Sequence, residues 1–280
     1  MIGSLEAGAC PACRTPSSRE LFAVGAYRLR RCTSCGLRFA DPRPDQKALD
    51  DFYGASYFDT HGWHGGPEGD SEYLRECWAG IRDHLNERFP KRGRLLDVGC
   101  ATGTLMIEAA RDGWDCVGLE VSEAATERAR GAGLDVRQGS LGDKRLEGEI
   151  FDVVCSFHVI EHVIDPRADL ALMRERVGRG GLAVIETPNA ESIGFKVRRA
   201  KWVQIRPPEH IQFFDRRSMG RALRSTGWRP LRQWTIYRPD TAARIAKQWS
   251  GALVGPARVA ARAVEAVGMG GNLRVIAEAV

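Results

Sequence analysis

The chain has 280 residues, of which 43% are hydrophobic and 28% are charged, and its formal net charge at pH 7 is +5. This length accommodates one ordinary domain and a small module, and the composition excludes a fibrous or wholly disordered chain. We find no run of about 18 apolar residues, so we expect no membrane span. The N-terminus lacks a basic segment followed by an apolar core, so we expect no signal peptide and a cytoplasmic location.

Four cysteines near the N-terminus form two C-x2-C pairs, Cys10 with Cys13 and Cys32 with Cys35, and eighteen residues separate the pairs. This spacing is typical of a structural zinc site in which each pair gives two thiolates to one tetrahedral ion. Disulfides are the alternative, and a cytoplasmic chain disfavours them. The intervening segment alternates like a hairpin but is too short to form a core without metal, so we predict a zinc ribbon over residues 1–45.

Residues 46–90 are predicted to form a helical linker and lid. We expect helices over 46–53 and 71–88, joined by a loop that contains Gly, His and aromatic residues without apolar periodicity. A loop of this composition suits a segment that covers a ligand.

From Arg94 onward, expected strands and helices alternate, which predicts a mainly parallel sheet with helices on both faces over residues 91–280. The expected strands cover 94–98, 115–120, 134–138, 151–157, 181–187, 229–237 and 272–279. The expected helices cover 103–112, 122–131, 166–177 and 216–226.

An insertion over about 239–270 has an apolar helical face. Its members are Val259, Ala260, Ala263, Val264 and Val267. We expect this face to pack on the sheet, with a second subunit or a membrane surface as the alternatives.

The most informative segment joins the first strand of this sheet to its helix. Asp97, Gly99, Ala101 and Gly103 form the pattern D-x-G-x-A-x-G, and Glu120 ends the next expected strand. Because glycine takes positive φ and has no Cβ, such a turn lets a ligand approach the backbone closely. The pattern lacks the G-x-G-x-x-G spacing of dinucleotide-binding turns, and a tight turn without a ligand is the plain alternative.

The segment resembles the first motif of class I S-adenosylmethionine (SAM) methyltransferases, D-x-G-x-G-x-G, with Ala101 in place of the middle glycine. The resemblance implies an α/β fold with a Rossmann-like seven-stranded sheet whose last strand is antiparallel. It implies that Asp97 lies near the methionine amino group and that Glu120 accepts both ribose hydroxyls. The cofactor-binding residues that it implies are Asp97, Gly99, Cys100, Ala101, Gly103, Glu120, Val121, Ser140, Leu141 and Phe157.

His158, Glu161 and His162 follow the strand expected over 151–157. The H-x-x-E-H spacing also occurs in inverted zinc proteases, but those need a long helix, whereas here a strand enters the motif and an Asp-Pro pair ends it. The stretch resembles the E-H-V-x-D-P segment of quinone-type and related small-molecule methyltransferases. Some of those bind a divalent ion at this position through acidic residues and His, and His158 replaces one of the acids.

A third motif, Pro207-Pro208-Glu209-His210, resembles the P-E-H-x-x-x-F run that borders the acceptor pocket in the same group. His210 or His158 is the candidate base, because imidazole titrates near neutral pH, and Glu161 is the candidate orienting group. Basic residues lie just before this motif: Lys196, Arg198, Arg199, Lys201 and Arg206. A solvated face is their ordinary interpretation, and a phosphate- or carboxylate-bearing acceptor is the alternative.

Together, the resemblances imply SAM-dependent methyl transfer to a small molecule in bacterial natural-product or sugar biosynthesis, including antibiotic biosynthesis. The alternatives are an rRNA or tRNA methyltransferase that binds RNA through its ribbon, and a non-catalytic zinc-ribbon interaction protein. Nucleic acid is disfavoured, because the strand motif is not the N/D-P-P-Y/F type and the ribbon has no extended basic tail. The sequence leaves the accepting atom and the oligomeric state open.

Overall fold

The computed structural model describes residues 8–45, 49, 66–237 and 254–280. Most of the lid loop and most of the helix expected over 46–53 lie outside these ranges. Within that helix Leu49 is the exception, and it is buried. The end of the lid loop, residues 66–70, is helical instead, because the helix expected from residue 71 already begins at Gly66.

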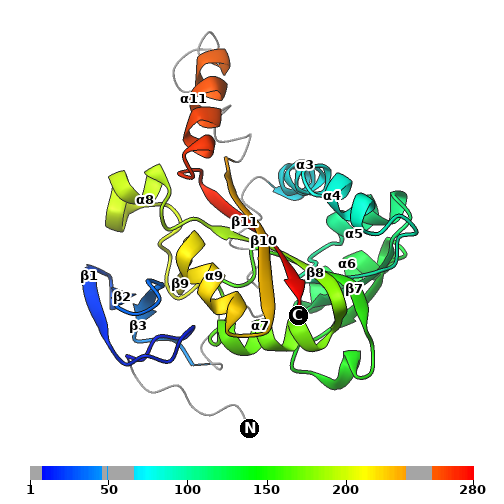
Figure 1. Ribbon diagram of the computed structural model, residues 1–280, viewed down its shortest axis with the longest axis horizontal. Coiled ribbons are helices and arrows are strands. Elements are labelled where there is room, and N and C mark those ends of the chain that lie inside the picture. The colour runs from blue at the N-terminus through cyan, green and yellow to red at the C-terminus, as the bar shows by residue number, and fades with distance from the viewer. Residues whose placement is uncertain (1–7, 46–48, 50–65, 238–253) are drawn as a thin grey trace.

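A seven-stranded sheet forms the centre of the molecule, in the order β10-β11-β8-β7-β4-β5-β6 (Figure 1). Its strands are β4 (Arg94–Val98), β5 (Asp115–Glu120), β6 (Asp135–Gln138), β7 (Phe151–Phe157), β8 (Val177–Pro188), β10 (Trp228–Ile236) and β11 (Asn272–Ala279). The strands from β4 to β8 pair in parallel, and β11 runs antiparallel to both β8 and β10. The predicted Rossmann-like fold with its antiparallel last strand is therefore confirmed.

Helices cover both faces of this sheet. They are α3 (Gly66–Ala79), α4 (Arg82–Arg88), α5 (Thr104–Arg111), α6 (Glu123–Gly131), α7 (Pro166–Glu175) and α9 (Arg216–Arg224). A further helix, α8 (Ile193–Arg198), lies beside the N-terminal strands, where Phe195 packs in a cluster with Leu29 and Phe213. Short 3-10 turns occur at Lys144–Leu146 and Arg199–Lys201. The single helix expected over 71–88 is two helices, because the chain leaves α3 at Gly80 and α4 begins after Ile81.

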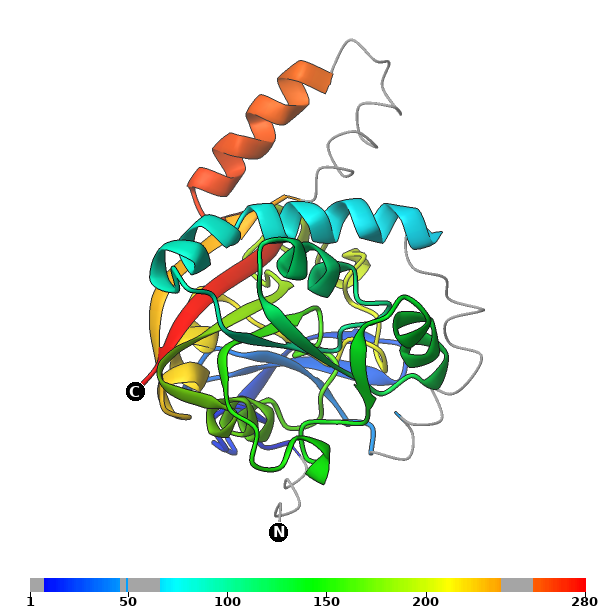
Figure 2. The ribbon, with the colours of Figure 1, turned by 90° about the vertical axis from the view of Figure 1, so that its right-hand side faces the viewer.

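Alternate residues of the strands point to opposite faces, and each face has its own core. Leu95 and Val153 pack under α3, α4 and α5, and Figure 2 shows α3 lying across this side of the sheet. Leu96 and Val154 pack under α7 and α9 on the other face. Both faces of β4 and β7 are thus apolar, as expected for strands at the centre of a parallel sheet.

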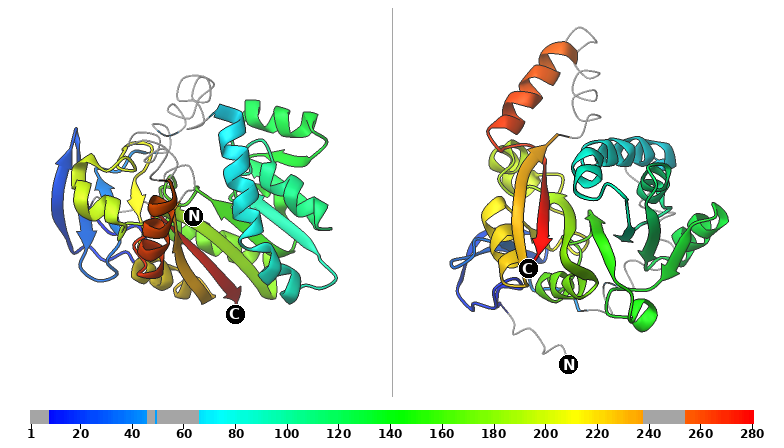
Figure 3. Two further views of the ribbon diagram at one scale, coloured as in Figure 1. Left: turned by 90° about the horizontal axis from the view of Figure 1, so that it is seen from above. Right: turned by 45° about the vertical axis from the view of Figure 1, so that its right-hand side comes forward.

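The N-terminal cysteine region forms a small antiparallel sheet with a strand of the main domain. The sheet order is β1 (Ser18–Val24), β2 (Tyr27–Cys32), β3 (Arg38–Asp41) and β9 (Gln212–Phe213). The predicted hairpin between the cysteine pairs is confirmed. Since β9 directly follows the P-E-H motif, the ribbon is joined to that segment by backbone hydrogen bonds (Figure 3, left).

Helix α11 (Val254–Ala266) differs from the expectation for the insertion. Val259 and Val267 are 70% and 69% exposed, so the apolar face of the described residues does not pack on the sheet. The helix projects from the body of the molecule (Figures 1 and 2), and Glu265 near its end contacts Thr235 and Tyr237 of the neighbouring strand end. Within the described residues we find no helix that is long and apolar enough to span a membrane.

Candidate active site

The carboxyl ends of the parallel strands meet at one edge of the sheet. There β4 ends at Val98, β5 at Glu120, β7 at Phe157 and β8 at Pro188. Ligands of open α/β sheets bind outside this edge. The topology therefore brings the predicted cofactor residues and the histidine motif to the same region.

The turn after β4 has three residues with positive φ: Gly99 at 69°, Ala101 at 52° and Gly103 at 81°. A side chain at Gly99 would collide with Val159, and one at Gly103 would collide with Leu134. Both glycines are therefore favoured by their positive φ, and Gly99 is also favoured by space, because the β-branched side chain of Val159 is stiff. Ala101 adopts a left-handed conformation that favours glycine, which explains why a glycine fits the same place in the resembling motif.

Glu120 connects this turn to the end of β5. Its Oε2 accepts the backbone N–H of Ala101 at 2.9 Å, and its Oε1 accepts that of Ser122 at 2.9 Å. Val121, the next residue, is 60% exposed and presents an apolar side chain beside the carboxylate. The predicted acid therefore lies directly against the predicted turn.

The remaining predicted cofactor residues lie at or just after the ends of β4, β6 and β7 at the same edge of the sheet. Cys100 and Leu141 are buried, and Phe157 ends β7. Ser140 follows β6 and donates its backbone N–H to Asp143 Oδ2 at 2.6 Å.

Asp97 adds a second buried acid close to Glu120. Burial and, to a smaller extent, the charge of Glu120 together raise the pKa of Asp97 to about 8. Burial also raises the pKa of Glu120. Two buried carboxylates that resist ionisation together create a place where a cationic ligand is electrostatically favoured.

His158 follows β7 with a φ of 56° and is held by a glutamate. Its Nδ1 lies 3.0 Å from Oε1 of Glu161, whose other oxygen accepts the hydroxyl of Thr187 at 3.0 Å. Burial raises the pKa of Glu161, but the hydrogen bond and charge of His158 and the charges of His162 and His210 outweigh it and lower the pKa to about 2. Glu161 is thus an ionised acceptor for the Nδ1 proton, which leaves Nε2 as the basic atom of His158.

The second candidate base, His210, has both ring nitrogens engaged within the chain. Nδ1 donates to the Gln204 carbonyl at 2.9 Å, and Nε2 accepts from Arg206 Nη2 at 2.9 Å. Its side chain is 4% exposed, and burial together with the nearby His162 lowers its pKa well below the usual value. His210 is therefore a neutral, enclosed imidazole, whereas the His158 side chain is 27% exposed.

Glu161, His162 and His210 place their ligand atoms within 4.8 Å of one another. His162 uses Nδ1 for the Glu209 carbonyl at 2.9 Å, and its ring meets that of His210 edge to face at 4.7 Å. Because the Arg206 guanidinium already contacts His210, an ion would share this space with a fixed cation. We interpret the cluster as the scaffold that holds the P-E-H segment against Glu161.

Four polar residues on the other side of His158 were not anticipated: Tyr73, Glu186, Asn272 and Arg274. Glu186 and Arg274 are fully or almost fully buried, and each interrupts an apolar strand. Opposite charges inside apolar strands are a sequence signal for a buried ion pair, because neither is stable there alone.

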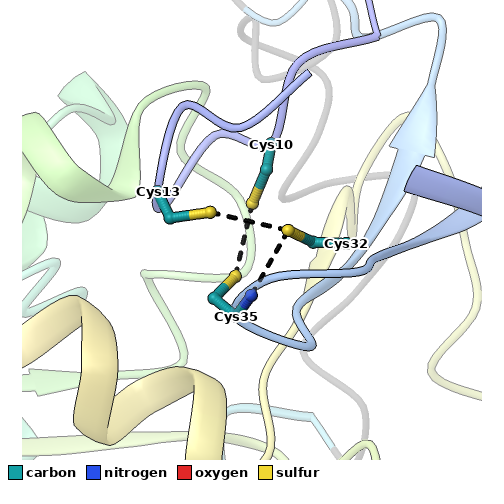
Figure 4. A group of neighbouring side chains, drawn as sticks. All are labelled: Cys10, Cys13, Cys32 and Cys35. Carbon is teal, nitrogen blue, oxygen red and sulfur yellow. Dashed lines mark hydrogen bonds between the residues drawn. The ribbon is translucent and has the colours of Figure 1, made fainter. Parts of the chain in front are cut away.

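The four N-terminal cysteines converge on one point (Figure 4). The Sγ atoms of Cys10 and Cys35 lie 3.5 Å apart, as do those of Cys13 and Cys32, and all four thiols are free. Sulfurs at the corners of a tetrahedral site with Zn–S bonds of about 2.3 Å lie about 3.8 Å apart. The geometry therefore fits a four-thiolate metal site.

A sheet of this strand order, a glycine turn after β4 and an acid at the tip of β5 define the class I SAM methyltransferase fold. A family model described as a methyltransferase domain matches residues 71–233, and the chain belongs to this methyltransferase family.

Two curated relatives are ubiquinone biosynthesis O-methyltransferases. The protein from Cereibacter sphaeroides is 37% identical over 142 residues, which cover 47% of this chain and 58% of the relative. The protein from Ruegeria pomeroyi is 30% identical over 194 residues, which cover 64% of this chain and 76% of the relative. The chain thus spans little more than half the length of the first relative.

Among solved structures, a magnesium protoporphyrin IX methyltransferase from Synechocystis PCC 6803 with bound S-adenosylhomocysteine (SAH) has a TM-score of 0.57. Its sequence identity to this chain is 15%, and the match covers 84% of this chain and 100% of that one. At this identity the likeness concerns the fold.

Proposed function

We propose that this chain transfers the methyl group of SAM to a small-molecule acceptor. The observation that carries the proposal is the contact between Glu120 at the tip of β5 and Ala101 in the positive-φ turn. A carboxylate in this place accepts the two hydroxyls of a ribose, and the exposed Val121 beside it offers an apolar surface for the base.

The charge of the site supports the same ligand. SAM carries a positive sulfonium and a positive ammonium group, and Asp97 and Glu120 are buried acids with raised pKa values. A cation next to them stabilises their ionised forms, so binding relieves an unfavourable arrangement in the ligand-free chain.

The sulfonium supplies an electrophilic methyl group, and the protein aligns the acceptor with it and removes a proton. We assign the proton to Nε2 of His158, with Glu161 orienting the ring and stabilising the imidazolium. His210 supports the neighbouring loop. The names of the curated relatives make a hydroxyl oxygen the first accepting atom to test.

The four-cysteine region is proposed to hold one structural zinc ion. Four protein thiolates fill a tetrahedral coordination sphere, so such an ion has no open position for catalysis. A cysteine ribbon followed by a methyltransferase sheet resembles the zinc-ribbon methyltransferases of bacterial natural-product and sugar biosynthesis, and we propose a pathway of that class on this resemblance.

RNA methylation is the second candidate, and it is favoured by exposed basic residues at and after α8. These are Lys196, Arg198, Arg199 and Lys201. A phosphate- or carboxylate-bearing small acceptor is favoured by the same residues. RNA binding that weakens steeply as salt rises would identify the RNA function, whereas salt-independent methylation of a small hydroxyl compound would identify the other.

Isothermal titration with SAM tests the cofactor site. We expect Glu120→Ala to weaken SAM binding by about 1–3 kcal/mol, the usual cost of losing hydrogen bonds to a charged group. Glu123→Ala, in the first turn of α6, is the matched control and should bind SAM like the unmodified chain. If Glu120→Ala binds SAM as tightly as the unmodified chain does, the assignment of the cofactor site to Glu120 is wrong. The reaction itself is tested separately, by measuring SAH formation with a panel of phenols and alcohols.

A further inference from the structure

His158 lies between two carboxylates rather than beside one. On the Nδ1 side, Glu161 Oε1 is 3.0 Å away, and on the Nε2 side, Glu186 Oε1 is 3.4 Å away. An imidazole with an ionised acceptor at each nitrogen is driven to hold both protons. A ring in that state is an acid and has no lone pair with which to remove a proton from an acceptor.

The carboxylate of Glu186, however, accepts hydrogen bonds from three side chains of other elements. Arg274 on β11 donates its Nε to Oε2 at 2.6 Å, and Asn272 donates its Nδ2 to Oε1 at 2.9 Å. The hydroxyl of Tyr73 on α3 also donates to Oε1. Arg274 balances the charge, and the other two donors occupy the oxygen that faces His158.

Tyr73 is a hydroxyl donor that contacts both His158 and Glu186. Its hydroxyl oxygen lies 3.2 Å from His158 Nε2 while its proton goes to Glu186. Asn272 also lies 3.2 Å from Nε2. The phenol and the amide thus each contact both the imidazole and the second carboxylate, and each donates to the carboxylate oxygen that faces His158.

The groups that contact His158 come from four parts of the fold. Glu161 follows β7, Glu186 lies near the end of β8, Tyr73 lies on α3 and Asn272 lies on β11. Arg274, also on β11, contacts Glu186. Behind Glu161 stand His162 and His210, and behind Glu186 stands the thiol of Cys77 at 4.0 Å. Among these described groups, Glu186 is the second negative charge within reach of Nε2.

We propose that Tyr73 is a positioning residue that keeps His158 available as a base, because its hydroxyl occupies Glu186 and prevents that carboxylate from capturing the Nε2 proton. This inference rests on the proposed function, in which His158 is the base. The inference also assigns a role to α3, because the packing of this helix on the sheet places the Tyr73 hydroxyl at the end of β8.

The test is a titration of the histidine rings by NMR in the full chain, with Tyr73→Phe compared with Tyr27→Phe in the ribbon hairpin. The His158 signals are assigned by their loss in His158→Gln. We expect the pH of half-protonation of His158 to rise by about one unit in Tyr73→Phe, since an opposite charge at this range shifts titration by about 1–3 units. An unchanged midpoint in a folded Tyr73→Phe chain would overturn the inference.

A double-mutant cycle tests whether Glu186 is the group that Tyr73 restrains. In Glu186→Gln, which keeps the shape and removes the charge, adding Tyr73→Phe should leave the His158 midpoint unchanged. A shift of equal size in both backgrounds would contradict the proposal. If Glu186→Gln does not fold, the acid limb of the SAH-formation profile in Tyr73→Phe supplies the second readout and should move to higher pH.

The two proposals fail in distinguishable ways. A shifted midpoint in a chain that binds no SAM supports the role of Tyr73 and overturns the proposed function. The other outcome is methyl transfer in which the unmodified chain and Tyr73→Phe have the same His158 titration midpoint and the same acid limb of the SAH-formation profile. That outcome supports the function and overturns the role of Tyr73.

Discussion

Arg38 of the ribbon and Asp215 of the main domain form a buried ion pair. Nη1 of Arg38 lies 2.8 Å from Oδ2 of Asp215, and the two side chains are 9% and 2% exposed. Asp215 also caps α9 by accepting the N–H of Ser218, and the Arg38 guanidinium lies 5.0 Å from the ring centre of Phe195. The pair therefore fastens strand β3 to the segment that follows the P-E-H motif.

We predict that Arg38→Ala lowers the free energy of unfolding by about 3–5 kcal/mol, because it leaves a buried carboxylate without its partner. Urea unfolding measures this change. Arg28→Ala is the control, since its pair with Glu20 is exposed and should contribute less than about 1 kcal/mol. Equal midpoints for the two variants would show that the ribbon is not fastened by this pair.

A second prediction concerns the pH dependence of stability in the SAM-free chain. The pKa of Asp97 is raised from its usual 3.8 to about 8, so the folded chain keeps a proton that the unfolded chain has lost. The free energy of unfolding should therefore fall as pH rises through this window. In Asp97→Asn that fall should be smaller, although Glu120 contributes in the same direction.

Thermal unfolding at a series of pH values checks this slope, with the exposed Asp83→Asn as the control. SAM should oppose the loss of stability, because a cation favours the ionised acid, and its binding should release protons below pH 8. An identical slope in Asp97→Asn would mean that this carboxyl does not titrate in the window.

The third prediction is one zinc ion per chain, bound by four thiolates. Cys32→Ser should lose the metal and destabilise the ribbon, because Cys32 faces Cys13 at 3.5 Å and accepts the N–H of Cys35. SAM binding should persist, since the turn after β4 lies in the main domain. Elemental analysis checks the metal content, and Cys116→Ala should retain it; stoichiometric zinc in Cys32→Ser would contradict the assignment.

Patterns that depend on neighbouring residues predicted most of the fold. The alternation of strands and helices and the glycine turn after Asp97 are local properties, and the structure has them where they were expected. The pairing of β3 with β9 is not local, because Phe39 and Gln212 are partners in the sheet although most of the main domain lies between them in the sequence. Sequence alone gives such a pairing no signal.

The site shows the same division. The sequence identified His158 and His210 as candidate bases but had no means to rank them, because burial and hydrogen-bond partners depend on packing. Glu186 and Arg274 each break an apolar strand, yet their pairing follows only from the antiparallel register of β8 and β11. The exposed face of α11 was missed because its periodicity fits packing on the sheet, on a second subunit or on a membrane equally well.

The last prediction separates the two histidines. If His158 removes the acceptor proton, His158→Ala should lower turnover by about 10²–10⁴, the usual contribution of a general base. His210→Ala should instead lower stability by about 1–3 kcal/mol, because the Gln204 carbonyl and the Arg206 guanidinium lose their buried partner. Turnover of the folded His210→Ala chain should then stay within about tenfold of the unmodified chain, since that ring has no unoccupied nitrogen. SAH formation and urea unfolding, measured on both variants, decide the assignment: a catalytic loss in His210→Ala with unchanged stability, and an active His158→Ala, would transfer the base to His210.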